Sequence, residues 1–152
     1  PAADGIVLAE VYDTDTAASP SRLISVSTLG YAASGVRALV PGFTIVGTAP
    51  KRLLVRAVGP GLAQFGVNET LADPRITLHP AGRTTAVAAN DNWSGDDTVV
   101  TATATAGAFA LTPGSNDAAL VVVLPPGGYT VMVAGAPGTY GNVLVEVYDL
   151  DP

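Results

Sequence analysis

The sequence predicts an all-β fold, a β-sandwich or jelly-roll-like domain with about nine or ten short strands and one short helix. Three observations predict this class. Short apolar segments alternate with polar residues at a period of two, which is the side-chain period of a strand. Turn-forming residues recur between these segments, with 17 Gly and 12 Pro in 152 residues. Hydrophobic residues make up 48% of the chain and charged residues only 13%, so we expect an ordered domain with a substantial core.

The first half of the chain contains four expected strands. They are residues 22–28, 36–40, 43–46 and 51–58. The last is the clearest, because Leu53, Val55 and Ala57 fall on one face of a strand. Residues 29–35 are expected to form a loop, and residues 62–67 one helical turn.

The second half continues the pattern with five expected strands. They are residues 75–79, 84–89, 118–124, 129–134 and 143–149. Residues 98–107 are ambiguous, since their Thr and Val content favours a strand while their Ala content favours a helix. Asp96 and Asp97 precede this segment and are good helix N-caps, so a short helix is the preferred prediction.

One strand sequence occurs at both ends of the chain. Residues 7–15 recur as residues 143–151, at an offset of 143 − 7 = 136 positions, with seven of the nine residues identical. This is the only clear internal repeat, and repeats at a fixed period are typical of tandem arrays. The chain is therefore interpreted as one full repeat preceded by the last strand of another.

The duplicated strand predicts an assembly device. A single sandwich needs this strand once, and a surplus copy exposes unpaired backbone groups and an apolar face. It could pair beside its twin or add to a neighbouring domain's sheet, and an open head-to-tail contact of the second kind builds a filament. The residues predicted to take part are Ile6, Val7, Leu8, Ala9, Glu10, Val11, Tyr12 and Asp13 in the first copy, and Val143, Val145, Val147 and Tyr148 in the second.

The predicted domain organisation follows from this repeat. Residues 1–15 are a terminal strand, donated to a neighbour or ending a preceding repeat, residues 16–21 are a linker, and residues 22–152 are the β-sandwich repeat. The repeat leaves one difficulty. If the second copy completes its own domain, the incoming copy needs another sheet edge, and the sequence does not identify it.

Charge and composition limit the partners and the location. The net charge is −6 and the seven Lys and Arg residues are dispersed, which argues against nucleic-acid binding. No apolar run approaches the roughly 20 residues of a membrane-spanning helix. The chain has no Cys, so it contains neither disulfides nor thiolate metal sites. Its low Lys content and acidic balance favour an extracellular or cell-surface location.

The most polar loop, residues 90–97, is a candidate ligand site. Asp91, Asp96 and Asp97 could supply the oxygen ligands that Ca²⁺ requires, and the exposed ring of Trp93 could stack on a sugar. The alternative is a solvated turn whose side chains cap local backbone groups, with Trp93 packed over the end of the sandwich. The turn is the favoured interpretation, and no other cofactor is expected.

The sequence does not predict an enzyme. The only His, His79, lies in an expected strand beside Pro80, without a nucleophile or an orienting acid near it in the sequence. Gly59-Pro60-Gly61 lacks the further glycines and the Lys of a phosphate-binding loop. We therefore expect no catalytic residues.

Six motifs, taken in order, resemble a tandem-repeat β-sandwich domain of large secreted and cell-surface proteins of environmental bacteria. They are RLISVST at 22–28, VGPGL at 58–62, LADP at 71–74, NDNW at 90–93, PGGYT at 126–130 and LVEVYD at 144–149. The resemblance covers residues 22–149 and implies a tandem, extracellular β-domain without an established activity. From Asp73 onward the chain is also loosely similar to bacterial pre-peptidase C-terminal domains, some of which bind calcium.

Two functions are therefore predicted from the sequence. The first is a structural subunit of an extracellular filament or surface fibre, in which the N-terminal strand adds to a neighbouring copy head to tail. The alternative is a glycan- or calcium-binding sandwich module of a larger secreted adhesin or exoenzyme.

Overall fold

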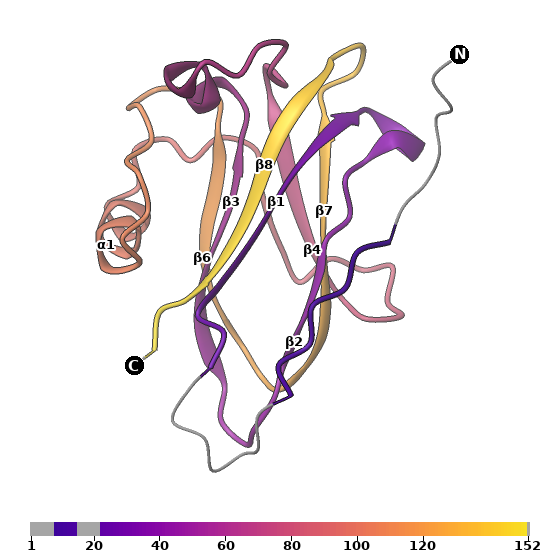
Figure 1. Cartoon of the computed structure of the whole chain (residues 1–152), viewed down its shortest axis with the longest axis vertical. Helices are drawn as coiled ribbons and strands as arrows, with labels where there is room; N and C mark the ends of the chain where they lie inside the picture. Colours follow the sequence, from indigo (N-terminus) through magenta and orange to yellow (C-terminus); the bar gives the residue numbers. More distant parts are fainter. Residues whose placement is uncertain (1–7, 15–21, 152) are drawn as a thin grey trace.

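The protein is a β-sandwich, seen in a computed structural model that describes residues 8–14 and 22–151. The first sheet has the strand order β1-β8-β3-β6 and the second has the order β2-β7-β4-β5 (Figure 1). All the paired strands are antiparallel. The strands are β1 (Ser25–Ala33), β2 (Gly42–Ile45), β3 (Lys51–Val58), β4 (Pro74–Pro80), β5 (Ala88–Asn90), β6 (Ala118–Leu124), β7 (Gly127–Gly135) and β8 (Tyr140–Asp149).

The main core lies between the two sheets. It is formed by the alternate residues that each strand turns inward, including Val55, Ile76 and Val133. β8 lies between β1 and β3, so its backbone is paired on both sides. Of the two copies of the repeated strand, the C-terminal one is therefore a central strand of the sandwich.

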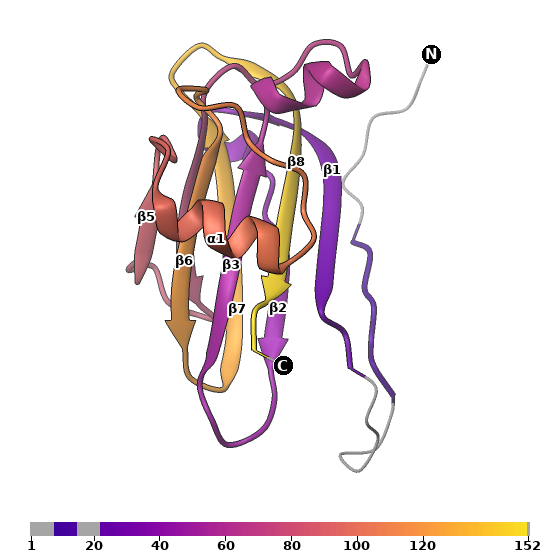
Figure 2. The same cartoon turned by 90° about the vertical axis from the view of Figure 1, so that its left-hand side faces the viewer.

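A second apolar cluster covers the outer face of the first sheet. The helix α1 (Asp97–Thr105) packs there against β6 and β3 (Figure 2). Val99 and Ala102 of the helix are buried with Leu54 of β3 and Leu150, which follows β8. Part of the first sheet is thus covered on both faces, which explains why β3 has few exposed residues.

The predicted all-β sandwich is confirmed, and so is the single α-helix. Asp96 is the N-cap of α1, where its side chain accepts a hydrogen bond from the backbone N–H of Thr98. The expected helical turn near residues 62–67 is a 3₁₀-helix, η2 (Pro60–Phe65). No helix in the described part of the chain is long and apolar enough to cross a membrane.

Several strand boundaries were predicted wrongly. The described residues form eight strands, fewer than expected. Residues 36–40 are no strand, because the left-handed conformation of Gly35 (φ +70°) begins the 3₁₀-helix η1 (Gly35–Arg37) and only a single bridge at Leu39 follows. Residues 29–33, expected in a loop, continue β1 because β8 is long enough to pair with them as far as Tyr140. The hairpin partner expected at residues 84–89 is reduced to β5.

Candidate functional site

The inner face of β8 holds the three valines predicted to act in strand pairing. Val143, Val145 and Val147 are all buried in the main core. Val147 lies opposite Val26 of β1 and Val55 of β3, so this face is filled from both neighbouring strands. The C-terminal copy thus occupies a closed slot between two partners.

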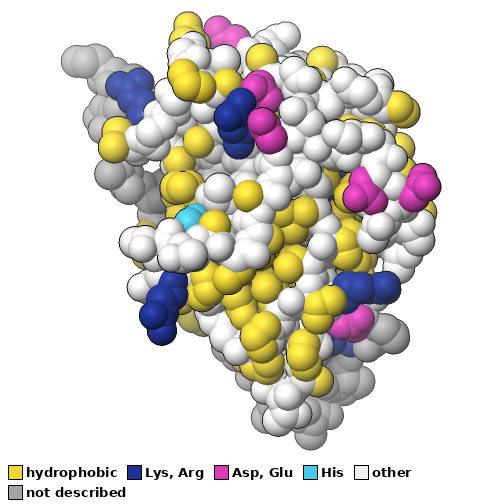
Figure 3. Space-filling model, turned by 180° about the vertical axis from the view of Figure 1, so that it is seen from behind, with side chains coloured by type: hydrophobic (Ala, Val, Ile, Leu, Met, Phe, Trp, Pro, Cys, Tyr) yellow, Lys and Arg dark blue, Asp and Glu magenta, His cyan; other side chains and the backbone are white. Residues whose placement is uncertain are grey.

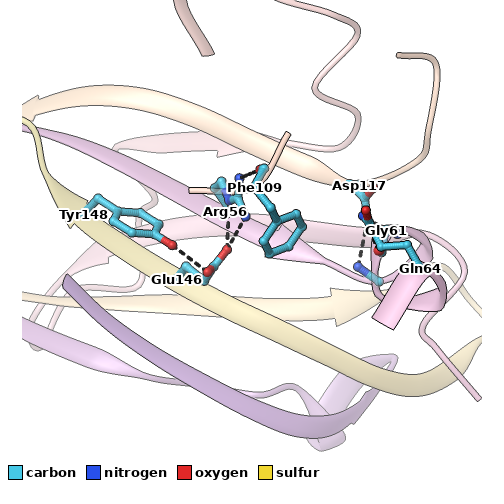
Figure 4. Close-up of polar contacts among 8 residues, drawn as sticks. Arg56, Gly61, Gln64, Phe109, Asp117, Glu146 and Tyr148 are labelled. Carbon is cyan, nitrogen blue, oxygen red and sulfur yellow. Dashed lines mark hydrogen bonds and ion pairs between the residues drawn. The ribbon is translucent and has the colours of Figure 1, made fainter. Parts of the chain in front are cut away.

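The outer face of β8 carries a buried ion pair. Glu146 Oε2 accepts hydrogen bonds from Nε and Nη2 of Arg56, at 2.8 and 2.6 Å (Figure 4). Arg56 is fully buried, donates a third hydrogen bond to the carbonyl oxygen of Phe109, and lies 4.3 Å from the centroid of the Phe109 ring. A buried guanidinium needs such partners, because an unpaired charge in the interior is very costly.

Tyr148 completes this cluster and responds to it electrostatically. Its hydroxyl group donates to Glu146 Oε1 at 2.7 Å. Burial, followed by the hydrogen bond to Glu146 and the charge of its carboxylate, raises the pKa of Tyr148 from 10.0 to about 12. The cluster ties β8 to β3 and to residue 109. Because Arg56 is fully enclosed and Glu146 is buried, the cluster anchors the strand.

The N-terminal copy of the strand is in the opposite situation. Ile6 and Val7 lie outside the described residues, and residues 8–14 belong to no strand. Leu8, Val11 and Tyr12 are 79%, 75% and 73% exposed. This part of the chain runs on the β1 side of the sandwich, apart from the sheets (Figure 2).

Its polar side chains nevertheless repeat the arrangement seen on β8. The hydroxyl group of Tyr12 donates to Glu10 Oε1 at 2.8 Å, as that of Tyr148 does to Glu146. The hydrogen bond to Glu10 is the main cause that raises the pKa of Tyr12. Glu10, Val11, Tyr12 and the neighbouring Ala9 and Asp13 are all exposed, so the strand-exchange residues of this copy that the structure describes are at the surface.

β1 is the sheet edge with the most exposed apolar surface. Along and just before it, Leu23, Ile24, Val26, Leu29 and Tyr31 are all exposed. The strand has nine residues, contains neither a charge nor a proline, and pairs with β8 in an unbroken register. Natural sandwiches usually protect a long edge with charges, prolines or bulges, so this edge is unusually open to another strand.

A narrow hollow opens between the edge strands of the two sheets. It has a volume of about 30 Å³ and lies between β1 and the start of β2, where it is lined by Val26, Phe43, Val145 and Val147, among others. Val26 faces inward, opposite Val147, and is still 44% exposed. The main core is therefore incompletely covered along β1.

The predicted calcium ligands are engaged in local structure. Asp91 forms an ion pair with Arg75, with Oδ1 2.9 Å from Nε. The helix N-cap hydrogen bond from Thr98 lowers the pKa of Asp96, and Asp97 lies in the first turn of α1. Within residues 8–14 and 22–151, no three acidic, His or Cys side chains gather where they could hold a metal ion.

Other residues of the loop 90–97 pack against the sandwich and form hydrogen bonds with it. The Trp93 ring is buried in the outer cluster, and its Nε1 donates to Ser115 Oγ at 3.2 Å. Asn90 Oδ1 accepts the backbone N–H of Ala119 at 3.0 Å. Trp93 thus takes the packing role that was the alternative to sugar stacking.

Asp117 is an important polar residue that the sequence did not single out. It is fully buried, and its Oδ1 accepts the backbone N–H groups of Gly59 and Gly61 at 2.8 and 3.1 Å (Figure 4). Ser115 donates to its other oxygen at 2.7 Å. A Cβ at Gly61 would lie 2.8 Å from Val58, so the Gly-Pro-Gly turn needs glycine there. The only available signal was the Asp beside a buried strand, which is a weak one.

A larger groove lies beside α1. It has a volume of about 340 Å³ and is lined by Arg52, Asp97, Thr98, Thr101, Ala102, Thr105, Val121 and Leu150. It contains no arrangement of nucleophile and base.

On the face of the molecule seen in Figure 3, the Lys and Arg side chains stand apart from one another. Arg22 and Lys51 both pair with Asp149, Arg56 pairs with Glu146, and Arg75 pairs with Asp91.

Comparisons with known proteins support the fold. No protein-family model matches the chain, and no curated protein matches its sequence. Among solved structures, the chain is similar to the pre-peptidase C-terminal domain of collagenase from Bacillus anthracis, with a TM-score of 0.50 and 13% sequence identity. The similarity covers 82% of this chain and 89% of that one, so the two share a β-sandwich architecture across nearly their whole length.

Proposed function

We propose that the protein is a non-catalytic structural subunit of an extracellular filament or surface fibre. Its copies assemble head to tail, because the N-terminal strand of one copy, residues 6–13, adds to a sheet of the next. One observation carries this proposal. The strand is present twice, and among the described residues only the C-terminal copy is part of a sheet, while residues 8–13 are exposed outside both sheets.

Strand addition satisfies groups that the isolated molecule leaves in water. Burying the side chains of Leu8 and Val11 is worth about 1.5–3 kcal/mol each. Each new backbone hydrogen bond adds about 0.5–1.5 kcal/mol. Association itself costs about 4–15 kcal/mol, so the balance is close and assembly should depend on protein concentration.

The geometry of such a contact favours an open polymer. The donor segment and the acceptor edge are different surfaces of the molecule, so two copies joined by one such contact keep one free donor and one free edge. Such a heterologous contact extends into a filament unless the rotation between subunits closes a ring. The contact does not require complementary charges on the donor and on the edge strand, because main-chain hydrogen bonds supply most of the affinity.

The extracellular location rests on composition and on fold. The chain has few Lys residues and a net charge of −6. The structural similarity is to a domain of a bacterial collagenase that is described as a pre-peptidase C-terminal domain and is not itself the peptidase. Both observations are consistent with an accessory β-module outside the cell.

The test compares the full chain with a variant that lacks residues 1–15. Both are followed by light scattering after size-exclusion chromatography over a range of concentrations, and by negative-stain electron microscopy. We expect polymers only from the full chain, and the same thermal unfolding midpoint for both at concentrations too low for assembly, because residues 8–14 belong to no strand. Monomers from both chains at every concentration would end the assembly proposal.

The alternative is a binding module for a glycan or for Ca²⁺. The groove beside α1, where three threonine side chains, Arg52 and Asp97 lie among apolar residues, is the surface that could take a small ligand. A glycan array and calorimetric titration with CaCl₂ test it on the variant without residues 1–15. Specific binding by this monomer, combined with no assembly of the full chain, would establish the alternative in place of the filament.

A further inference from the structure

We infer that the acceptor for the incoming strand is the free edge of β1 in a second copy of this chain. This inference rests on the proposed strand addition and names the surface that receives it. The donor is the segment that contains Leu8 to Asp13. In the assembled form the first sheet would read donor-β1-β8-β3-β6.

The slot that β8 occupies is a poor alternative for the donor. There the donor would place Ala9 where Val145 fills the core, and Thr14 where Leu150 is buried beside α1. Both changes remove buried apolar volume, and the chain's own β8 is always present at high local concentration. The donor therefore needs an edge that is still free.

β1 is the longest free edge of the sandwich. The other edge strands are β2 with four residues, β5 with three and β6 with seven. β6 also packs under α1, with Ala119 and Val121 in the outer cluster. β1 has nine residues, enough for the whole donor, and its apolar side chains are exposed.

The backbone of β1 shows which residues would receive the donor. The carbonyl oxygen of Ile24 accepts a hydrogen bond from the N–H of Asp149, so Ile24 bonds toward β8. In an antiparallel pair this direction alternates along the strand. Val26 and Thr28 therefore also bond toward β8, while the N–H and C=O groups of Ser25, Ser27, Leu29 and Tyr31 point to the free edge.

Both faces of the donor match what β1 leaves uncovered. The inward face of β1 carries Val26 and Thr28 beside the hollow that reaches Val145 and Val147. Ala9 and Val11 would cover this opening. The outward face carries the exposed Leu29 and Tyr31, against which Leu8 and Tyr12 can pack as cross-strand neighbours.

A second copy is the occupant we infer, because residues 8–12 and the edge of β1 in one chain are not joined in a sheet although they are close in the sequence. Residues 8–14 belong to no strand, while Leu8, Val11 and the apolar residues of β1 stay exposed in the same molecule. Two unsatisfied surfaces on one chain can be satisfied by the complementary surfaces of others.

The decisive variant is Ser27→Pro. It removes an N–H that points to the free edge and leaves the ladder to β8 intact, and proline is tolerated on edge strands. Ser27→Ala, which keeps the N–H, is the matched control. We expect Ser27→Pro to raise the concentration needed for half-polymerisation by up to about tenfold, with Ser27→Ala unchanged. Unfolding midpoints of both variants confirm that the monomers are folded.

Cross-linking tests the contact directly, since the native chain contains no Cys. A chain with Val11→Cys is mixed with a chain with Thr28→Cys and oxidised. We expect a disulfide-linked dimer, because both side chains are on the inward face. Mixing Val11→Cys with Leu29→Cys, which faces outward, should give none.

The outcomes separate this inference from the proposed function. If the unmodified chain polymerises and Ser27→Pro polymerises equally well, the acceptor edge lies elsewhere and strand addition stands. If the double variant Val11→Cys/Thr28→Cys forms only a monomeric disulfide at all concentrations, the edge is occupied by the chain's own segment and the second copy is wrong. If the unmodified chain never polymerises, the proposed function and this inference fall together.

Discussion

Residues 8–14 and residues 144–150 differ at two of seven positions, yet one copy is exposed and the other is a central strand. On β8, Val145 lies opposite Thr28 and Ala57, so it has a paired strand on each side. The described residues provide no such partners for Ala9. The comparison shows that a strand sequence with period-two alternation still requires neighbouring strands to supply its hydrogen bonds and its burial.

The polar side chains sharpen the comparison. The Glu-x-Tyr hydrogen bond is made in both copies, at 2.8 Å between Tyr12 and Glu10 and at 2.7 Å between Tyr148 and Glu146. Only Glu146 also has a guanidinium partner, Arg56. The hydrogen bond between the Glu and the Tyr therefore depends on the local sequence, whereas the guanidinium partner of Glu146 is supplied by the fold around β8.

Removing the negative charge of Glu146 should have the largest effect on the free energy of unfolding. Glu146→Gln leaves Arg56 buried and without its counter-charge, so we expect a loss of about 3–5 kcal/mol in the free energy of unfolding. Glu10→Gln is the matched control in the exposed copy and should change it by less than about 0.5 kcal/mol. Urea unfolding of both variants, in the chain without residues 1–15 for Glu146 and in the full chain for Glu10, measures the difference. A loss below about 1 kcal/mol for Glu146→Gln would mean that Arg56 is hydrated despite its enclosure.

The next largest effect on the free energy of unfolding is expected from a substitution on the inner face of β8. Val145→Ala gives β8 the residue that the N-terminal copy has at this position, and it removes buried methyl groups from the core. We expect a loss of roughly 2 kcal/mol in the free energy of unfolding, by chemical denaturation.

The reverse change tests the donor. Ala9→Val should leave the unfolding free energy unchanged while it lowers the concentration at which polymers appear, because a larger side chain would then cover the hollow beside β1. Weaker assembly of Ala9→Val, with the unfolding free energy unchanged, would argue that Ala9 does not face the core of the neighbour.

The fold class was predictable because it depends on local signals. Period-two alternation in residues 51–58, the turns that end the strands and the N-cap at Asp96 all act within a few residues. The boundaries of β1 were not predictable, because Gly30 favours a loop locally while the long partner β8 keeps residues 29–33 in the sheet. Pairing between strands more than 100 residues apart leaves no trace in a local pattern.

Some features of the candidate site were likewise predictable from the sequence, and others were not. The surplus strand was visible from the repeat alone, but the open edge was not, since the hollow beside Val26 lies between β1 and the start of β2, which a local pattern does not bring together. The Arg56–Glu146 pair was hidden as well, because the two residues are distant in the sequence and meet only through the register of β3 and β8. The interpretation of residues 90–97 as a turn rested on Asn and Asp chemistry, which the hydrogen bonds of Asn90 and Asp96 illustrate.

The last comparison is the titration of the two tyrosines. The pKa of Tyr148 is about 12 in the folded protein against 10.0 ordinarily, and burial is the first cause. A raised pKa stabilises the fold fully below pH 10, and this contribution is lost as the pH rises through about 12. We therefore expect the unfolding free energy to fall across this interval, and Tyr148→Phe to reduce the slope.

Tyr12 distinguishes the effect of a local hydrogen bond on a tyrosine pKa from the effect of burial. Its pKa is also raised, but mainly by the hydrogen bond to Glu10 at a fully exposed position. Salt should therefore lower the pKa of Tyr12 more than that of Tyr148, because exposed charges are screened and desolvation is not. Phenolate absorbance, as the difference between the unmodified chain and Tyr12→Phe or Tyr148→Phe at low and high salt, measures both. Equal salt responses in a monomeric sample would mean that Tyr148 is as hydrated as Tyr12, and that burial does not distinguish the two copies at this position.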